Sequence, residues 1–139
     1  MALWGGRFSQ SPADSVFALS RSVQFDWRLA PYDLAASLAH VRALHRGSII
    51  DSATAEALTR ALKDLADEIS SGKFAPVDED EDVHSALERG LIAKIGEKGG
   101  AIRAGRSRND QVVTAFKLYL MDAMTEIADS LSILSTALL

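Results

Sequence analysis

The sequence contains no cysteine, only three prolines and no long apolar segment. Without cysteine it offers no disulfide, thiol nucleophile or thiolate metal site, which fits a reducing cytoplasm. No run approaches the roughly 18 apolar residues of a membrane span, and residues 1–8 lack the pattern of a signal peptide. A formal net charge of −4 gives no general reason to expect nucleic acid as a partner. We therefore expect a globular cytoplasmic protein that binds neither membranes nor nucleic acids.

Alanine and leucine are abundant, and no stretch alternates apolar and polar residues in the way that strands do. We therefore predict an all-α fold. A short helix is predicted at residues 14–19, and longer helices begin near Pro31, after Asp51 and after the acidic run at residues 78–82. A glycine is the predicted C-terminal stop of each of these longer helices: Gly47, Gly72 and Gly96.

A last helical pattern starts with Asn109 or Asp110 as its cap and reaches Leu139 without a helix breaker. Apolar residues occupy most of its circumference, so neighbouring helices are needed to cover it. Its length of about 45 Å exceeds the diameter of a compact globule of this size. We expect an N-terminal helical domain at 1–108 and the first stretch of a central helical bundle at 109–139. Because no stop signal precedes Leu139, we expect the chain to be the front part of a longer protein.

The segment Gly99–Arg108 combines glycines with three arginines in a chain that is acidic overall. Glycine lets a ligand approach the backbone, arginine binds carboxylate or phosphate bidentately, and the following helix N-terminus favours anions. The segment predicts an anion-binding corner, with a solvent-exposed basic turn as an equally good alternative. A nucleotide-phosphate site at Gly100–Ser107 is a much weaker hypothesis. Its spacing approaches that of a P-loop, but arginine replaces the required lysine and no strand precedes it.

A second polar cluster lies at the start of the third long helix and comprises Asp80, Asp82, His84 and Glu88. His84 and Glu88 are one helical turn apart and could pair, so the cluster could form one wall of a binding site. A capped, solvent-exposed helix start is the simpler alternative, and a metal site is less favoured because the ligand spacing is not recognisable. The other imidazole and indole side chains are interpreted as surface, core-edge or packing residues: His40, His45, Trp4 and Trp27.

Three motifs, taken in order, resemble one known family. LWGGRF at Leu3–Phe8, DEDVHSALERGL at Asp80–Leu91 and GRSRNDQV at Gly105–Val112 are similar to the N-terminal part of the argininosuccinate lyase family. This family belongs to the fumarase and aspartase superfamily. The likeness covers essentially the whole chain, and GRSRND is its most specific element. Lens δ-crystallins are similar to the same family, so a non-enzymatic helical structural or oligomerisation protein is the alternative.

The resemblance implies a mainly helical homotetramer whose active sites form between subunits around a central bundle. It implies cleavage of argininosuccinate, a substrate with two carboxylates in its succinate part, to arginine and fumarate. This is a step of arginine biosynthesis and of the urea cycle. The reaction is a β-elimination that needs no metal and no organic cofactor.

The resemblance also implies which residues of this chain contact the substrate: Arg108, Asn109, His84, Ser22, Ser107 and Gln111. No catalytic residue is expected in this segment, because the family's catalytic histidine and mobile serine loop lie in later segments. The chain by itself is therefore expected to be inactive. One departure concerns Arg103-Ala104, which stand where many members have His-Thr. Arg103 could supply a different contact to an anion there.

Overall fold

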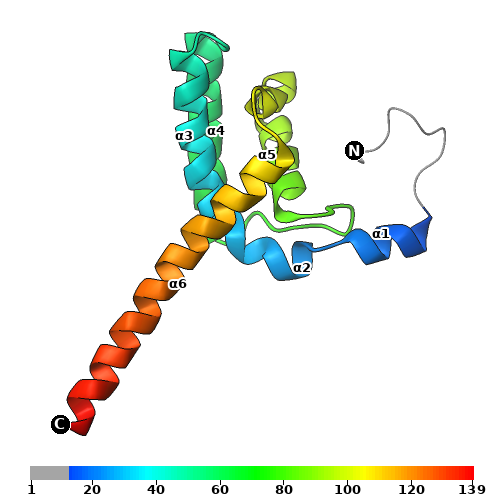
Figure 1. Ribbon diagram of the computed structural model, residues 1–139. Coiled ribbons are helices and arrows are strands. Elements are labelled where there is room, and N and C mark those ends of the chain that lie inside the picture. The colour runs from blue at the N-terminus through cyan, green and yellow to red at the C-terminus, as the bar shows by residue number, and fades with distance from the viewer. Residues whose placement is uncertain (1–12) are drawn as a thin grey trace.

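The computed structural model describes residues 13–139, and within this range all regular structure is helical. The elements are α1 (Asp14–Ser20), α2 (Val23–Asp26), the 3₁₀ helix η1 (Trp27–Leu29), α3 (Ala30–Arg46), α4 (Ser52–Ser70), α5 (Val83–Ile95), the 3₁₀ helix η2 (Gly96–Arg103) and α6 (Arg108–Leu138). Figure 1 shows α3 and α4 as an antiparallel pair, with α5 beside them and α6 running away from the group. The predicted all-α fold is confirmed for this range. The motif Leu3–Phe8 and Trp4 lie outside the described residues.

The α3–α4 hairpin begins and ends close to the predicted positions. Pro31 lies in the first turn of α3, where its missing N–H leaves no helical bond unmade. Asp51 accepts a hydrogen bond from the Thr54 backbone N–H at 2.7 Å and caps α4, as predicted. The turn between the helices differs in detail, because Gly47 keeps a φ of −78° and Ser48 is the residue with positive φ, at 55°. Since the Gly47 N–H still bonds to the last turn of α3, the chain reverses one residue later than predicted.

The acidic run before α5 stabilises the start of that helix. Asp82 accepts a hydrogen bond from the Ser85 N–H at 2.6 Å, and the Ser85 hydroxyl accepts one from the Asp82 N–H at 3.0 Å. Asp80 is buried; it accepts the Val77 N–H at 2.9 Å and two bonds from Arg89 at 2.8 and 3.0 Å. Both oxygens of Asp80 are therefore engaged within the fold. Because a buried carboxylate needs such partners, Asp80 has a role within the fold. This corrects the prediction that Asp80 forms part of one wall of a binding site.

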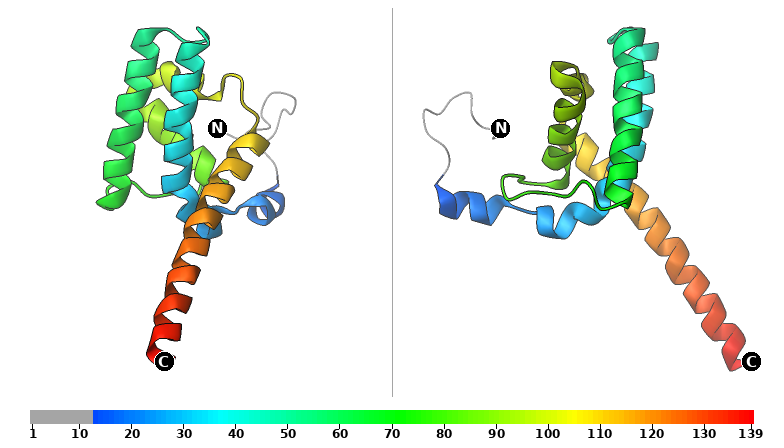
Figure 2. Two further views of the ribbon diagram at one scale, coloured as in Figure 1. Left: turned by 60° about the vertical axis from the view of Figure 1, so that its left-hand side comes forward. Right: turned by 180° about the vertical axis from the view of Figure 1, so that it is seen from behind.

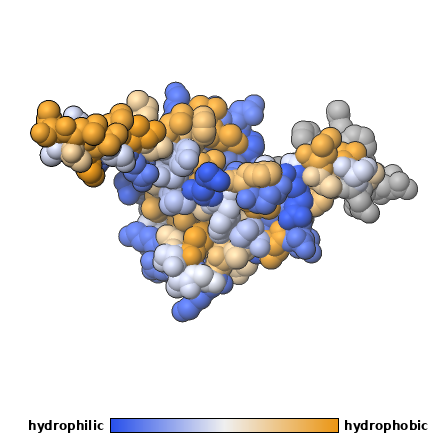
Figure 3. Space-filling view, turned by 90° about the horizontal axis from the view of Figure 1, so that it is seen from below, coloured by the Kyte–Doolittle hydropathy of each residue, from blue (hydrophilic) through white to orange (hydrophobic). Residues whose placement is uncertain are grey.

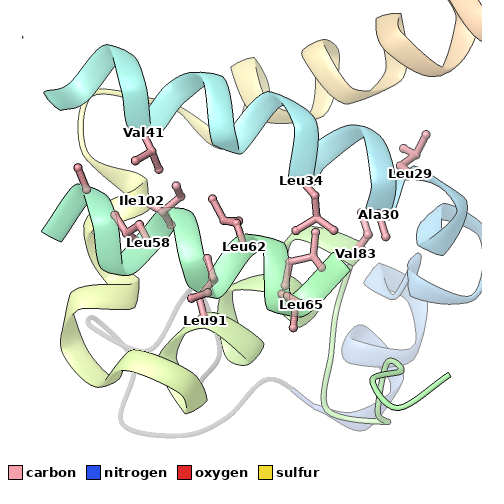
Figure 4. Packing of buried hydrophobic residues seen from close by; sticks show 13 residues of the cluster. Leu29, Ala30, Leu34, Val41, Leu58, Leu62, Leu65, Val83, Leu91 and Ile102 are labelled. Carbon is pink, nitrogen blue, oxygen red and sulfur yellow. The ribbon is translucent and has the colours of Figure 1, made fainter. Parts of the chain in front are cut away.

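The hydrophobic core lies between α3, α4 and α5, and η2 closes it. In Figure 4 the core side chains converge from all of these elements. Leu58, Leu62 and Leu65 of α4 are at most 1% exposed. They pack among side chains from the neighbouring elements, which include Leu34, Val41, Val83, Leu91 and Ile102. Because Ile102 belongs to η2, the core also holds the segment that leads into α6.

Helix α6 leaves this core and projects from the rest of the chain, as Figures 1 and 2 show from different sides. Of its residues only Ala115 is buried, and Tyr119 packs edge-on against Tyr32 with ring centroids 5.8 Å apart. Figure 3 shows the apolar surface of the projecting arm, whose exposed side chains include Leu120, Met124, Ile127, Leu131, Leu134 and Leu138. The long, broadly apolar helix is confirmed, whereas its separation from a domain at 1–108 stays a prediction. Within residues 13–139, no helix combines the length and apolar character needed to cross a membrane.

Candidate functional site

Most of the predicted glycine-rich loop is helical. Gly96–Arg103 form η2, and only residues 104–107 connect η2 to α6. Gly99 lies against the backbone of α5, where an added Cβ would come within 2.8 Å of the Ile92 nitrogen and the Leu91 carbonyl carbon. Ile102 is 3% exposed and belongs to the core. Packing against α5 and the core therefore overrides the loop prediction and fixes the arginines that follow.

Gly99→Ala is expected to lower the free energy of unfolding by about 1–3 kcal/mol, because a methyl group would collide with backbone that cannot rotate away. Urea unfolding measures this effect. Gly100→Ala is the matched control, since nothing lies within 4 Å of the Cβ position at Gly100. Equal unfolding free energies for the two variants would contradict the close approach of η2 to α5.

A buried carboxylate, Asp33 of α3, lies at the centre of the polar residues. It accepts hydrogen bonds from His84 Nδ1 at 2.8 Å and from the Ser37 hydroxyl at 3.0 Å. Gln111 Nε2 lies 3.0 and 2.8 Å from its two oxygens. Asp33 is 1% exposed and His84 is 2% exposed. The four side chains come from α3, α5 and α6, so this network forms only in the folded chain.

Asp33 is ionised in spite of its burial. Burial acts to raise the pKa of this carboxyl, but the hydrogen bond and charge of His84, with the bonds from Gln111 and Ser37, bring its pKa below the ordinary value. Because an ionised carboxylate can only accept hydrogen bonds, His84 carries a proton on Nδ1. In the neutral imidazole this makes Nε2 a hydrogen-bond acceptor.

Arg106 and Arg108 flank the network with loosely held guanidinium groups. The two terminal nitrogens of Arg106 donate to the Ser37 hydroxyl at 3.3 and 3.4 Å. Burial lowers the pKa of the half-buried Arg106 from its ordinary value, so an anionic ligand would compensate a poorly solvated charge. Arg108 donates to Gln111 Oε1 at 3.4 Å and lies 3.8 Å from the Asp82 carboxylate. Both arginines can exchange these long contacts for the oxygens of a bound carboxylate.

The predicted pairing of His84 with Glu88 is wrong. His84 contacts Asp33 instead, while Glu88 pairs with Arg103 at 3.3 Å and lies 4.0 Å from Arg108. His84 faces the buried interface with α3, where its ring needs a hydrogen-bond partner, whereas Glu88 lies at the half-buried edge. The Arg103 side chain is 57% exposed. It alone of the three arginines fits the alternative of a solvent-exposed basic turn.

The polar residues line a small cleft at the junction of α3, α5, η2 and α6. Its walls include Asp33, Ser37, His84, Arg106 and Gln111, with apolar residues of the core behind them. The volume of the cleft is about 20 Å³. This is room for about one water molecule. The cleft is therefore too small to enclose an organic substrate.

Ser22 lies at the same end of α5 as His84. Its hydroxyl donates to the Asp26 carboxylate at 2.7 Å, and its backbone N–H donates to the Glu81 carbonyl at 2.8 Å. Asp26 also accepts the Val83 N–H at 3.0 Å. The segment that carries Ser22 is thus held at the N-terminus of α5, next to the residues that lead to His84.

Ser107 caps α6, in place of the predicted Asn109 or Asp110. Its hydroxyl accepts the Asn109 N–H at 3.0 Å, and the Asp110 carboxylate accepts the Ser107 N–H at 3.1 Å. This capping box needs its acidic residue three positions after the cap, which Asp110 supplies. The fold therefore brings Arg108, Gln111 and His84 together but leaves the Asn109 side chain at the surface. Substrate contacts by the six predicted residues stay a prediction.

Sequence reasoning missed Asp33 and Ser37. Both lie on the buried face of α3, which they share with Ala30, Leu34 and Val41. Two polar residues within an apolar stripe are a detectable signal, because a buried polar side chain requires a partner. The partners themselves are not detectable in this way, since His84 and Gln111 are 51 and 78 residues away along the chain.

The nucleotide-binding alternative does not fit the described fold. A P-loop follows a buried strand, whereas in residues 13–139 the helices α5 and η2 precede and include much of Gly100–Ser107. The same described range holds no group of three or more His, Asp or Glu side chains arranged to hold a metal ion.

His40 and Trp27 have the structural roles predicted for them. His40 is half-buried at the core edge, and its Nε2 donates to the Ala104 carbonyl at 2.9 Å. Burial lowers the pKa of His40, so the bond is made by a neutral ring. Trp27 packs against Phe74 with ring centroids 6.2 Å apart. The bond from His40 ties the connection between η2 and α6 to α3.

Comparison with known proteins places the chain in a family. Residues 6–139 match the family described as Lyase. The chain is 56% identical over 138 residues to the argininosuccinate lyase of Frankia casuarinae, covering 99% of this chain and 30% of that protein. It is also 51% identical to the argininosuccinate lyase of Mycolicibacterium smegmatis, covering 92% of this chain and 28% of the relative. It is 52% identical to the argininosuccinate lyase of Nocardia farcinica, covering 91% of this chain and 27% of that protein.

The chain thus spans about 30% of the length of the curated relatives it matches. The matched range contains the buried network around Asp33 and the basic residues before α6. Since the family match covers nearly all of it, this chain belongs to the lyase family.

Proposed function

We propose that this chain is the N-terminal part of an enzyme that cleaves argininosuccinate to arginine and fumarate, in the biosynthesis of arginine. The observation that carries the proposal is its 56% identity, over 99% of its length, to an argininosuccinate lyase. The basic wall formed by η2 and the start of α6 supports it, because the substrate carries carboxylates that arginine binds well.

The proposed reaction is a β-elimination. A base removes the proton from the carbon beside a carboxylate, and the electrons are held briefly as an aci-carboxylate. The carbon–nitrogen bond then breaks as an acid protonates the departing guanidinium nitrogen, and the carbon–carbon double bond of fumarate forms. In this proposal the residues described above bind and orient the substrate, while the base and the acid belong to other segments.

The proposed binding residues lie on two helices. Arg108, Asn109 and Gln111 occupy the first turn of α6, where the positive end of the helix dipole favours an anion. His84 offers its Nε2 from α5. Ser22 and Ser107 complete the proposed set, and the half-buried guanidinium of Arg106 adds positive charge beside it.

We also propose that the whole protein assembles as a homotetramer in the cytoplasm, with each site shared between subunits. Two observations support this assembly. The cleft of this chain is too small to enclose the substrate, so further groups must complete the site. The projecting part of α6 exposes large apolar side chains, including Met124, Leu131 and Leu138, which a helical bundle would cover.

The test is a turnover assay on the complete protein that contains residues 1–139, expressed from its native reading frame. We expect it to release fumarate from argininosuccinate, followed by the ultraviolet absorbance of fumarate. Residues 1–139 expressed alone, at the same concentration, are the control and are expected to show no turnover. A complete protein that is folded and assembled but releases no fumarate would overturn the proposal and support the non-enzymatic structural alternative.

A further inference from the structure

Asp33 has an environment that a merely structural carboxylate rarely needs. It is 1% exposed, yet it is ionised and accepts four hydrogen-bond contacts from three side chains. Burying a charge is costly unless it is paired and hydrogen-bonded, and a neutral side chain of similar shape would avoid that cost. The charge at this position therefore calls for an explanation beyond packing.

The contacts of Asp33 connect the elements that carry the proposed site. His84 belongs to α5 and Gln111 to α6, and both bond directly to this carboxylate of α3. Arg108 is one step further, because it donates to Gln111 Oε1 at 3.4 Å. Arg106 is also one step away, through the Ser37 hydroxyl, which donates to Asp33. Asp33 thus contacts His84 and Gln111 directly and is connected to Arg106 and Arg108 through one further side chain each.

The carboxylate also determines how His84 presents its ring. As a pure acceptor it holds the proton on Nδ1, which leaves Nε2 as the nitrogen available to a ligand. An amide in its place would offer a donor as well as an acceptor. His84 could then turn its unprotonated Nδ1 toward that donor and carry the proton on Nε2. Only a carboxylate at this position excludes that tautomer.

We propose that Asp33 is a positioning residue of the lyase site, which holds His84 in the Nδ1-protonated tautomer and aligns Gln111, and with it Arg108, toward the substrate. This inference rests on the proposed function and goes beyond it by assigning a role to a residue that cannot itself reach the substrate. Asp33 acts through His84 and Gln111, and its removal leaves every binding residue present but misaligned.

The kinetic test is a double-mutant cycle on kcat/KM in the complete protein, with Asp33→Asn and His84→Asn. His84→Asn keeps a donor toward Asp33 in place of Nδ1 but removes Nε2. We expect Asp33→Asn alone to lower kcat/KM about tenfold or more, as for other groups that orient a ligating histidine. In the His84→Asn background the same change should cost at least threefold less, because the part of its effect that acts through His84 is already lost and only the part through Gln111 remains.

The control is Asp64→Asn, which neutralises an exposed carboxylate on α4 and should leave kcat/KM unchanged. An unfolding midpoint is measured for each variant, since a structural role alone would lower stability and act equally in both backgrounds. The proposal would be overturned if Asp33→Asn lowered kcat/KM by the same factor in the presence and in the absence of His84. It would also be overturned if Asp33→Asn kept kcat/KM within twofold of the unmodified protein. If Asp33→Asn does not fold, Asp33→Glu takes its place in the cycle. That variant keeps the carboxylate but moves it by one methylene.

A spectroscopic measurement on the same preparations does not depend on activity. Solid-state NMR of protein labelled with ¹⁵N-histidine, with His84 assigned by its loss in the His84→Asn variant, should show the proton on Nδ1. In Asp33→Asn at least part of the signal should move to the Nε2-protonated form. If the His84 tautomer changes in Asp33→Asn, but neither the unmodified protein nor any variant cleaves argininosuccinate, the proposed function fails and the positioning by Asp33 stands. An unchanged tautomer in Asp33→Asn would overturn the positioning role itself.

Discussion

Arg108→Lys in the complete protein is expected to lower kcat/KM for argininosuccinate about 10- to 150-fold, corresponding to about 1.5–3 kcal/mol. Lysine keeps the positive charge but loses the planar fork that binds both oxygens of a carboxylate. The Arg108 side chain is 25% exposed and its present contacts are long: 3.4 Å to Gln111, and 3.8 and 4.0 Å to the carboxylates of Asp82 and Glu88. A guanidinium held this loosely at the start of α6 is available to a substrate.

The measurement is steady-state release of fumarate, with the unfolding midpoint recorded on the same samples. Arg46→Lys is the matched control, because Arg46 is exposed at the end of α3, away from the cleft. It should leave both quantities unchanged. If Arg108→Lys keeps kcat/KM within twofold of the unmodified protein, Arg108 does not bind a substrate carboxylate through its fork.

Leu62→Ala is expected to reduce the free energy of unfolding by about 2–5 kcal/mol, because it removes a buried side chain and leaves a cavity. Leu62 is 1% exposed in the middle of α4 and packs in the core with Leu34, Leu58 and Leu91. It also lines the cleft. A collapse of the core toward the vacated space would therefore shift the elements that hold the polar network, and the loss of stability should be accompanied by weaker substrate binding.

Urea unfolding monitored by circular dichroism measures this loss. Leu19→Ala makes the same chemical change at a side chain that is 89% exposed, and it should alter the unfolding free energy by no more than about 0.5 kcal/mol. Equal effects at the two positions would mean that Leu62 is not part of a close-packed core.

Two features of the chain lead to the same conclusion about its role. The cleft beside Asp33 and His84 has polar walls but room for about one water only. Helix α6 begins at that cleft and continues into an arm whose apolar side chains are exposed. The small cleft and the exposed apolar arm are both consistent with further protein around them, and the chain spans about 30% of the length of its relatives.

Features that depend on neighbouring residues were predictable. Asp51 caps α4 through an N–H three residues ahead, and Gly96 ends α5 with a φ of 63°. The apolar spacing of Leu58, Leu62 and Leu65 correctly marked the buried face of α4. In each case the energetic preference is contained in a few consecutive residues, so it can be recognised without knowledge of the fold.

Features that depend on distant residues were not predictable. The pairing of His84 with Glu88 follows from helical spacing alone, yet His84 bonds to Asp33, 51 residues earlier. Gly99–Arg103 has the composition of a loop, yet contact with α5 and burial of Ile102 make it helical. Local preference is worth less than the burial of an apolar side chain or the pairing of a buried charge, so tertiary packing decides such cases.

The sequence by itself determined that this protein is helical and where most of its longer helices begin and end, and its clustered arginines predict an anion site near Arg108. Helix caps, apolar periodicity and clustered arginines are local properties that every fold of this chain must satisfy. Only the tertiary structure decided that Asp33 lies at the centre of a buried polar network, because a buried carboxylate acquires its partners when α3, α5 and α6 pack together. Asp33 then remains charged, since three side chains from these helices supply the hydrogen bonds that water no longer can.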